Sequence, residues 1–141
     1  MDLPADAFMD MFAEELGETA ELVDGVEQAL AECRDNGCIL YCASNGVRAM
    51  QIHRLEKAGL LGMFQDVYVS DDIGYEKPDH RFFDICLSRS GVKQEEALMI
   101  GDGKLTDIEG AMRAGWHACW FDKKDTKKYV MSYKKEEEPC R

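Results

Sequence analysis

Two aspartates, Asp102 and Asp107, follow an apolar run in a glycine-rich segment, ALMIGDGKLTDIEGAMRAG at residues 97–115. The pattern predicts a buried strand that ends in an acidic loop and turns into a helix, with Thr106 and Glu109 spaced as a capping box. Ligands of open α/β sheets bind at the carboxyl ends of the strands, so both carboxylates lie where chemistry takes place. Carboxylate oxygens suit a hard cation such as Mg²⁺. The plainer interpretation is a helix cap beside a surface acid.

Polar residues also follow two other predicted strands. Ser44, Asn45 and Gly46 come directly after the apolar run CILYCA at residues 38–43, and Lys77 lies in the loop after the next strand. The Ser44 hydroxyl and nearby backbone N–H groups can bind phosphoryl oxygens at a helix N-terminus, where the dipole favours an anion. The Lys77 ammonium can neutralise charge on the same group. Taken alone, Ser44 and Asn45 also fit a helix cap, and Lys77 also fits a surface lysine.

These loops together predict one phosphoryl-transfer site. In this interpretation Asp102 holds the Mg²⁺ that bridges protein and phosphate, and Asp107 orients Lys77 or a metal-bound water. The candidate residues are Ser44, Asn45, Lys77 and Asp107 for catalysis, Asp102 for the metal, and Ser44, Asn45 and Gly46 for substrate binding. Three such signals in this order, each at the end of a strand, are not expected from packing alone.

The elements that carry these loops alternate along the chain. Apolar runs predict strands, at residues 38–43, 67–69, 97–100 and 117–121. Segments with apolar residues at helical spacing lie between them and mostly end at a glycine. This alternation predicts an α/β fold with a parallel sheet, right-handed crossovers and helices on both faces.

Composition limits the function. The 141 residues fit one domain, and the net charge of −11 argues against binding to nucleic-acid backbones. No apolar run approaches the about 20 residues of a membrane span, so no membrane partner is expected. The six cysteines include no C-x-x-C pair, which argues against zinc and favours reduced thiols in the cytoplasm. Five of them fall on apolar strands or helix faces: Cys33, Cys38, Cys42, Cys86 and Cys119.

Three motifs in this chain resemble motifs two, three and four of the haloacid dehalogenase (HAD) superfamily. They are SNG at residues 44–46, GYEKPDHRFF at 74–83 and MIGDGKLTDIEGAMRAG at 99–115. The wider run between them is most similar to the subfamily of 5′-nucleotidases that act on pyrimidine and non-canonical nucleoside monophosphates. The resemblance implies a Rossmann-like core and a Mg²⁺-dependent phosphohydrolase that acts through an aspartyl-phosphate. The implied substrate is a small phosphorylated metabolite such as a nucleoside monophosphate.

The first motif of that superfamily, an Asp-x-Asp on the central strand, is not found. Residues 4–16 are instead predicted to form a helix, which the resemblance places at the end of a helical cap. The expected organisation is a cap remnant at residues 1–20, a partial core at 21–122 and a charged tail at 123–141. Within that tail, residues 129–133 are expected to form a short strand or a docking segment.

A core without its central strand would leave unpaired backbone groups in the sheet. Three arrangements stay open: separated halves, direct pairing of residues 38–43 with 97–100, or self-association with a second copy through the gap. The chain is then expected to lack the nucleophile and to be inactive in isolation. The alternatives are a truncated, non-catalytic binding module, an inactive remnant, or a fragment of a longer protein.

Overall fold

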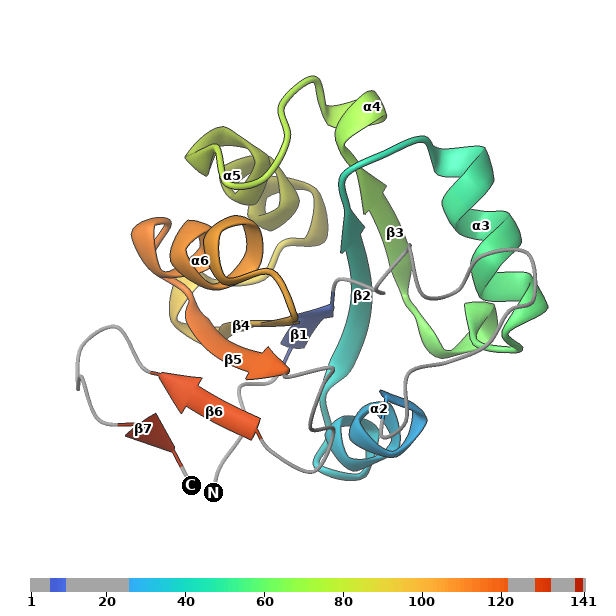
Figure 1. The fold of residues 1–141 in the computed structure, drawn as a ribbon, viewed down its shortest axis with the longest axis horizontal. Coiled ribbons are helices and arrows are strands. Elements are labelled where there is room, and N and C mark those ends of the chain that lie inside the picture. The colour runs from blue at the N-terminus through green and yellow to red at the C-terminus, as the bar shows by residue number, and fades with distance from the viewer. Residues whose placement is uncertain (1–5, 10–25, 122–128, 133–138, 141) are drawn as a thin grey trace.

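The computed structural model of the chain describes residues 6–9, 26–121, 129–132 and 139–140. These residues build one seven-stranded sheet with the order β3-β2-β1-β4-β5-β6-β7 (Figure 1). The strands are β1 (Asp6–Met9), β2 (Ile39–Ser44), β3 (Asp66–Val69), β4 (Ala97–Gly101), β5 (His117–Phe121), β6 (Tyr129–Ser132) and β7 (Pro139–Cys140). The first five are parallel, and β6 and β7 are added antiparallel. The parallel α/β fold expected from the sequence is confirmed.

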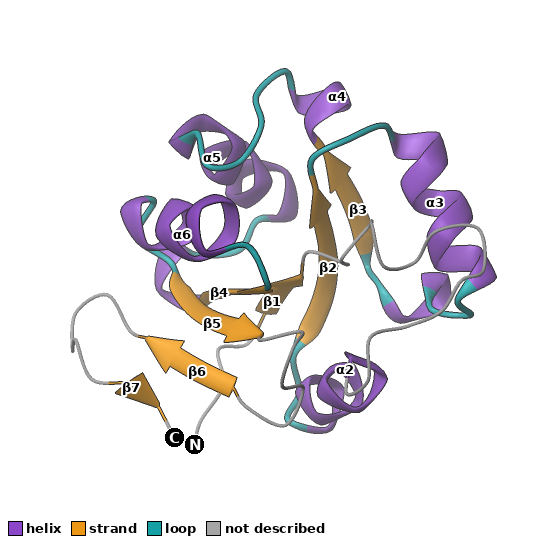
Figure 2. Ribbon diagram, viewed as in Figure 1, coloured by secondary structure: helices purple, strands orange, loops and turns teal. Residues whose placement is uncertain are grey.

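Helices connect the parallel strands and cover both faces of the sheet (Figure 2). The helices are α2 (Val26–Asp35), α3 (Arg48–Lys57), α4 (Ser70–Ile73), α5 (His80–Ser90) and α6 (Gly110–Arg113). Short helical segments complete the connections: η1 (Leu61–Met63), η2 (Gln94–Glu96) and η3 (Lys104–Glu109). No helix within the described ranges is both long enough and apolar enough to cross a membrane.

Alternate residues of the strands enter two separate cores. On β2, Leu40 and Cys42 pack with residues of α2 and α3, whereas Tyr41 and Ala43 pack with α5 on the opposite face. This alternation follows from the period of two in a strand. It explains why the apolar run at β2 is continuous, because both faces are covered.

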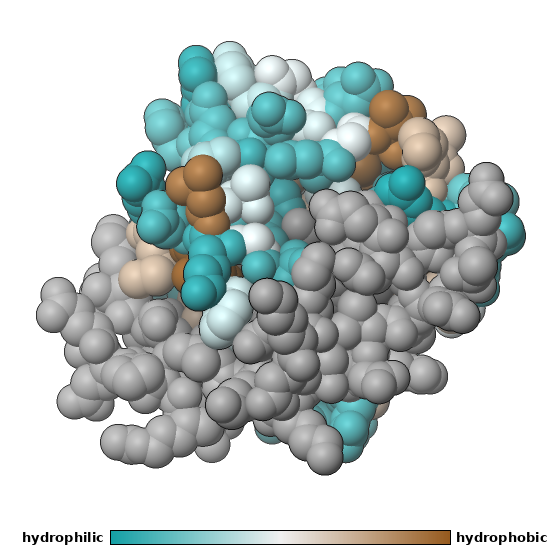
Figure 3. Space-filling view, in the orientation of Figure 1, coloured by the Kyte–Doolittle hydropathy of each residue, from teal (hydrophilic) through white to brown (hydrophobic). Residues whose placement is uncertain are grey.

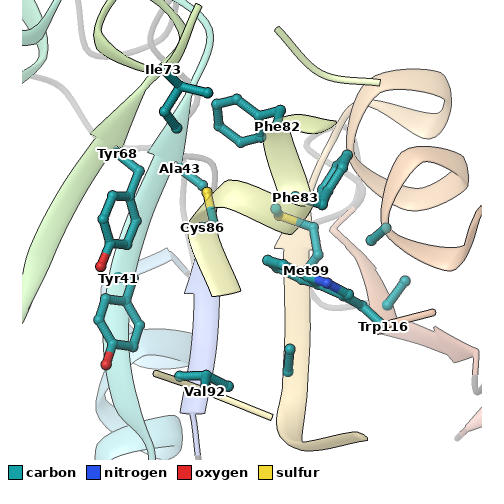
Figure 4. Packing of buried hydrophobic residues seen from close by; sticks show 13 residues of the cluster. Tyr41, Ala43, Tyr68, Ile73, Phe82, Phe83, Cys86, Val92, Met99 and Trp116 are labelled. Atoms are coloured by element: carbon teal, nitrogen blue, oxygen red, sulfur yellow. The ribbon is translucent and has the colours of Figure 1, made fainter. Parts of the chain in front are cut away.

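The core on the α5 and α6 side is aromatic and lies beneath the loops of the candidate site. The ring of Phe83 meets those of Phe82 and Trp116 edge to face, with centroids 5.6 and 5.1 Å apart (Figure 4). All three side chains are fully buried. This packing fixes α5, which begins three residues after Lys77, against the sheet.

The sheet contains a central strand, which the sequence did not predict. Asp6–Met9 is strand β1, paired in parallel with β2 on one side and β4 on the other. The predicted helix over residues 4–16 is therefore wrong at these positions, and so is the predicted absence of a central strand. The remaining residues of that helix lie outside the described ranges. The physical reason is that β2 and β4 each present an edge of unpaired backbone groups, and one inserted strand satisfies both. The chain itself thus fills the gap that motivated the expected self-association.

Two further expectations concern the tail and the cysteines. The short strand expected at residues 129–133 is confirmed as β6, which pairs with β5. Five cysteines are buried, as expected. Burial raises the pKa of the Cys33 and Cys86 thiols to about 12, so both stay protonated at neutral pH. On the face that Figure 3 shows, the described residues are mostly hydrophilic, with a few hydrophobic side chains among them.

Candidate functional site

The candidate residues lie at the carboxyl ends of the parallel strands. Ser44 is the last residue of β2, and Asp102 follows the end of β4 directly. Lys77 lies in the loop between α4 and α5, and Asp107 lies in η3. The fold therefore brings segments far apart in the sequence to one edge of the sheet, as the alternation of strands and helices predicts.

A buried ion pair joins two of these loops. The Lys77 Nζ atom lies 2.6 Å from Oδ1 of Asp107 and donates a hydrogen bond of 2.9 Å to the backbone oxygen of Ala43. Both charged side chains are almost completely buried, at 2% and 0% exposure. Ala43 directly precedes Ser44, so the ammonium contacts the backbone one residue before the residue expected to bind phosphate. Close geometry and additional hydrogen bonds are what a buried pair needs to offset the cost of losing water.

Asp107 reaches Lys77 because of an unusual turn after β4. Its Oδ2 accepts a 3.0 Å hydrogen bond from the backbone N–H of Gly103, and its own N–H donates to the Gly103 oxygen at 2.9 Å. The segment η3 is a π-type helix that begins at Lys104 without a side-chain cap. The capping box predicted at Thr106 is therefore wrong, because the Asp107 carboxylate takes the role of acceptor at this helix start.

Ser44 is held by a residue that sequence reasoning missed. Its hydroxyl donates to Oε1 of Gln51 at 3.3 Å, and Gln51 Nε2 donates to Sγ of Cys42 at 3.6 Å. Gln51 is buried on the inner face of α3, one turn before Leu55. A polar residue on the apolar face of a helix is the sequence signal that could have identified it.

Asn45 uses its side chain to hold the Lys77 loop. Its carboxamide donates to the Lys77 backbone oxygen at 3.0 Å and accepts from the Lys77 backbone N–H at 2.8 Å. Gly46 has φ +150° and donates its N–H to Oγ of Ser70 at 2.8 Å. These two residues thus fasten the β2–α3 loop to the segment before α5, and the Asn45 side chain positions Lys77.

Asp102 is held through its backbone. The indole N–H of Trp120, on β5, donates to the Asp102 oxygen at 3.2 Å. The Lys104 ammonium lies 4.3 Å from the centroid of the Trp120 ring, a cation–π contact. Trp120 was not among the predicted site residues, because its role depends on the neighbouring strand. The half-buried Asp102 carboxylate lies at the end of β4, where it can meet a ligand at the sheet edge.

The arrangement suits the binding of an anion better than the binding of a metal ion by protein side chains alone. A buried ammonium, a hydroxyl and a helix start converge at the end of β2, and these groups stabilise negative charge. No cluster of three or more His, Cys, Asp or Glu side chains that could hold a metal occurs in the described part of the chain. Of the two aspartates after β4, Asp107 is already engaged by Lys77 and Gly103.

Comparison with known proteins identifies the family to which the chain belongs. The family model of haloacid dehalogenase-like hydrolases matches residues 4–121. The chain belongs to this family. The resemblance of the three motifs to HAD proteins is thereby confirmed, and the relatives of this HAD-family chain include pyrimidine 5′-nucleotidases.

Similar proteins of this family are named for different substrates. The HAD-family chain is 42% identical to a phosphoserine phosphatase of Thermus thermophilus over 69% of its own residues and 39% of that protein. It is 32% identical to the pyrimidine 5′-nucleotidase PynA of Streptococcus pneumoniae, over 76% of its residues and 46% of PynA. The magnesium-bound crystal structure of the HAD-hydrolase YfnB from Bacillus subtilis has a TM-score of 0.67 and 34% identity, covering 72% of this chain and 46% of YfnB. The chain therefore spans less than half of the length of each of these relatives.

Proposed function

We propose that this chain provides the phosphate-binding part of a Mg²⁺-dependent phosphohydrolase for small phosphomonoesters, with a nucleoside monophosphate as the expected type of substrate. One observation carries the proposal: the Lys77 ammonium is buried at the end of β2, where it contacts the Asp107 carboxylate and the backbone oxygen of Ala43, the residue before Ser44. Asp107 compensates the charge of this ammonium and holds it at the carboxyl edge of the sheet, where its N–H groups can stabilise the additional negative charge of a phosphoryl ligand. The HAD family, with its phosphatase and nucleotidase relatives, supports a phosphoryl group as that ligand.

In this proposal each residue has a distinct role. The Ser44 hydroxyl turns from Gln51 Oε1, to which it donates in this structure, to a phosphoryl oxygen, and the Asn45 backbone N–H donates to a second phosphoryl oxygen before the start of α3. The Gly46 N–H is already used by Ser70, so Gly46 contributes its backbone conformation rather than a hydrogen bond. Lys77 neutralises charge on the phosphoryl group, and Asp107 orients Lys77.

Asp102 is the residue that would hold Mg²⁺. Mg²⁺ is usually bound by one or two carboxylates together with waters and substrate phosphates, rather than by a cage of protein ligands. The donor set fits this pattern, because Asp102 supplies a carboxylate beside the expected phosphate position while Asp107 is engaged elsewhere. When bound, the ion supplies positive charge that polarises the phosphoryl group.

The described residues do not identify the nucleophile that attacks phosphorus. The resemblance implies an aspartate at the carboxyl end of the central strand. Within the described residues β1 carries Asp6, which pairs with Ile39 and Ala97 at the amino end of the strands, the edge opposite Ser44. Asp10 follows β1 in the sequence and lies outside the described ranges. We therefore propose that the described residues bind and orient the phosphoryl group. A phosphate-binding module without catalysis is the second candidate, favoured by the position of Asp6.

Binding of inorganic phosphate, measured by calorimetry with and without Mg²⁺, tests the proposed site. We expect Ser44→Ala to weaken phosphate binding about fivefold, the value of one lost hydrogen bond. Ser88→Ala, at an exposed position on α5, should leave the affinity unchanged. Asp102→Asn should abolish the effect of Mg²⁺ on phosphate affinity. If Ser44→Ala binds phosphate as tightly as Ser88→Ala, phosphate does not bind at this edge.

Hydrolysis of 4-nitrophenyl phosphate tests whether the chain alone catalyses phosphoryl transfer. We expect the purified chain to show no turnover above the protein-free rate, because loss of a covalent nucleophile typically costs several orders of magnitude. Hydrolysis that Asp102→Asn abolishes would contradict this expectation. Loss of that hydrolysis in Asp10→Asn would then identify Asp10 as the phosphoryl acceptor.

A further inference from the structure

A hollow of about 560 Å³ adjoins the proposed phosphate-binding residues. One wall is the β2–α3 loop with Asn45 and Val47, and the other is the segment from Ser70 to Glu76. Its volume is in the range of sites that bind small molecules. The hollow adjoins the phosphate-binding residues, because Asn45 belongs to both and Glu76 directly precedes Lys77. A group esterified to a phosphate held at Ser44 would have this space beside it.

The two walls are fastened to each other and to the site. The backbone N–H of Asp71 donates to the Gly46 oxygen at 3.0 Å, and Gly46 in turn donates to Ser70. On the other side, the Asn45 carboxamide makes two hydrogen bonds to the Lys77 backbone. The hollow is therefore a formed feature whose position relative to Ser44 and Lys77 is fixed by hydrogen bonds.

Its lining is acidic. Asp71 and Glu76 are exposed, and no lysine or arginine is among the described lining residues. The cations of the neighbouring segments face carboxylates of their own. Arg48 lies 3.5 Å from Asp66 and 3.6 Å from Asp72. The Lys77 ammonium contacts Asp107. Two carboxylates thus remain without a described ion pair, which gives the hollow a negative potential.

The lining also offers an aromatic and an aliphatic side chain. Tyr75 is 38% exposed, and Val47 is 46% exposed. The guanidinium of Arg81 lies 4.2 Å from the centroid of the Tyr75 ring. Arg81 also pairs with Asp79 at 2.7 Å, and these hydrogen bonds lower the pKa of Asp79 to about 2. The charge of Arg81 is therefore balanced, and its contact with the ring keeps Tyr75 at the wall of the hollow.

We propose that this hollow binds the leaving group of the phosphomonoester and selects neutral or cationic leaving groups with an apolar or aromatic face over anionic ones. A second phosphate or a carboxylate on the leaving group would meet Asp71 and Glu76 and be repelled. An amino group or another hydrogen-bond donor would be favoured by the same carboxylates. This inference rests on the proposed phosphate site, because the position of the phosphate determines where the leaving group would lie.

Three aryl phosphates of similar size test this selectivity: 4-(aminomethyl)phenyl, 4-methylphenyl and 4-carboxyphenyl phosphate. Their affinities are measured by calorimetry beside that of inorganic phosphate. We expect the aminomethyl ester to bind more tightly than the carboxy ester by about fivefold or more, with the methyl ester between them. Two partly solvated charges at contact distance support a difference of this size.

A double variant assigns the selectivity to the hollow. Asp71→Asn/Glu76→Gln should reduce the ratio of the two charged esters to less than about twofold. The matched control is Glu32→Gln/Asp35→Asn, which removes one Asp and one Glu at exposed positions of α2. These precede the amino end of β2, at the opposite edge of the sheet. The control changes the net charge equally and should keep the original ratio.

The outcomes separate this inference from the function on which it rests. If inorganic phosphate does not bind, or binds equally to the Ser44→Ala variant, the proposed phosphate site is wrong and the leaving-group assignment falls with it. If phosphate binds at Ser44 but the three esters bind equally, only the selectivity of the hollow is overturned. The same holds if both double variants change the ratio to the same extent, because general electrostatics would then explain it.

Discussion

Replacing Asp107 by alanine is expected to lower the free energy of unfolding by about 3–5 kcal/mol, the usual cost of breaking a buried ion pair from one side. The change leaves the Lys77 ammonium in a buried position without the carboxylate 2.6 Å away. It also removes the acceptor of the Gly103 N–H. Urea denaturation of the wild-type chain and the variant, at the same pH and ionic strength, measures the difference.

Two further variants show whether the cost arises from the uncompensated charge. Lys77→Met/Asp107→Leu replaces both charges by apolar side chains and should recover most of the lost stability. Glu109→Ala breaks an exposed pair with Arg113 at 3.5 Å and should cost less than about 1 kcal/mol. An Asp107→Ala variant that unfolds at the same urea concentration as Glu109→Ala would show that the buried pair contributes little. The double variant should still fail to bind phosphate, which separates the function of the pair from its effect on stability.

The parallel sheet was predictable because its signals are local. Continuous apolar runs identified β2 and β4 to within one residue, since strands covered on both faces need apolar residues at every position. Strand β1 could not be predicted in this way. Residues 4–16 carry apolar side chains at helical spacing, and a strand forms at Asp6–Met9 where two sheet edges require a partner. Pairing across the sheet, which no local pattern contains, decided the conformation.

In the candidate site, too, the features set by local sequence were predictable and those set by tertiary contacts were not. The order of the motifs placed Ser44 and Asp102 at strand ends and Lys77 in the connection after β3, because parallel strands bring their carboxyl ends to one edge. The role of the Asn45 side chain was not predictable. It bonds to the backbone of Lys77, which is 32 positions away in the chain, and so depends on how two loops meet. Gln51 and Trp120 act through the same kind of tertiary contact.

Adding a methyl group at Gly101 is expected to disrupt the site, because Gly101 packs against Asp107. In the Gly101→Ala variant the new Cβ would lie 2.6 Å from Cγ of Asp107 and would overlap its carboxylate. Asp107 cannot rotate away without losing Lys77 and the Gly103 N–H. We expect a loss of about 3 kcal/mol in unfolding free energy, from overpacking together with a weakened ion pair. Phosphate affinity should fall at least about tenfold, because Lys77 loses the contact that orients it.

Gly62→Ala is the matched control, because a Cβ at Gly62 meets no atom within 4 Å. It should change stability by less than about 0.5 kcal/mol and leave phosphate binding intact. A double-mutant cycle then tests the cause. In an Asp107→Ala background two of the three contacted atoms are gone and the Cβ at 2.8 Å remains, so Gly101→Ala should cost less than in the wild-type chain. Additive costs would contradict this explanation, since they would mean that Gly101 is required for a reason unrelated to the Asp107 carboxylate.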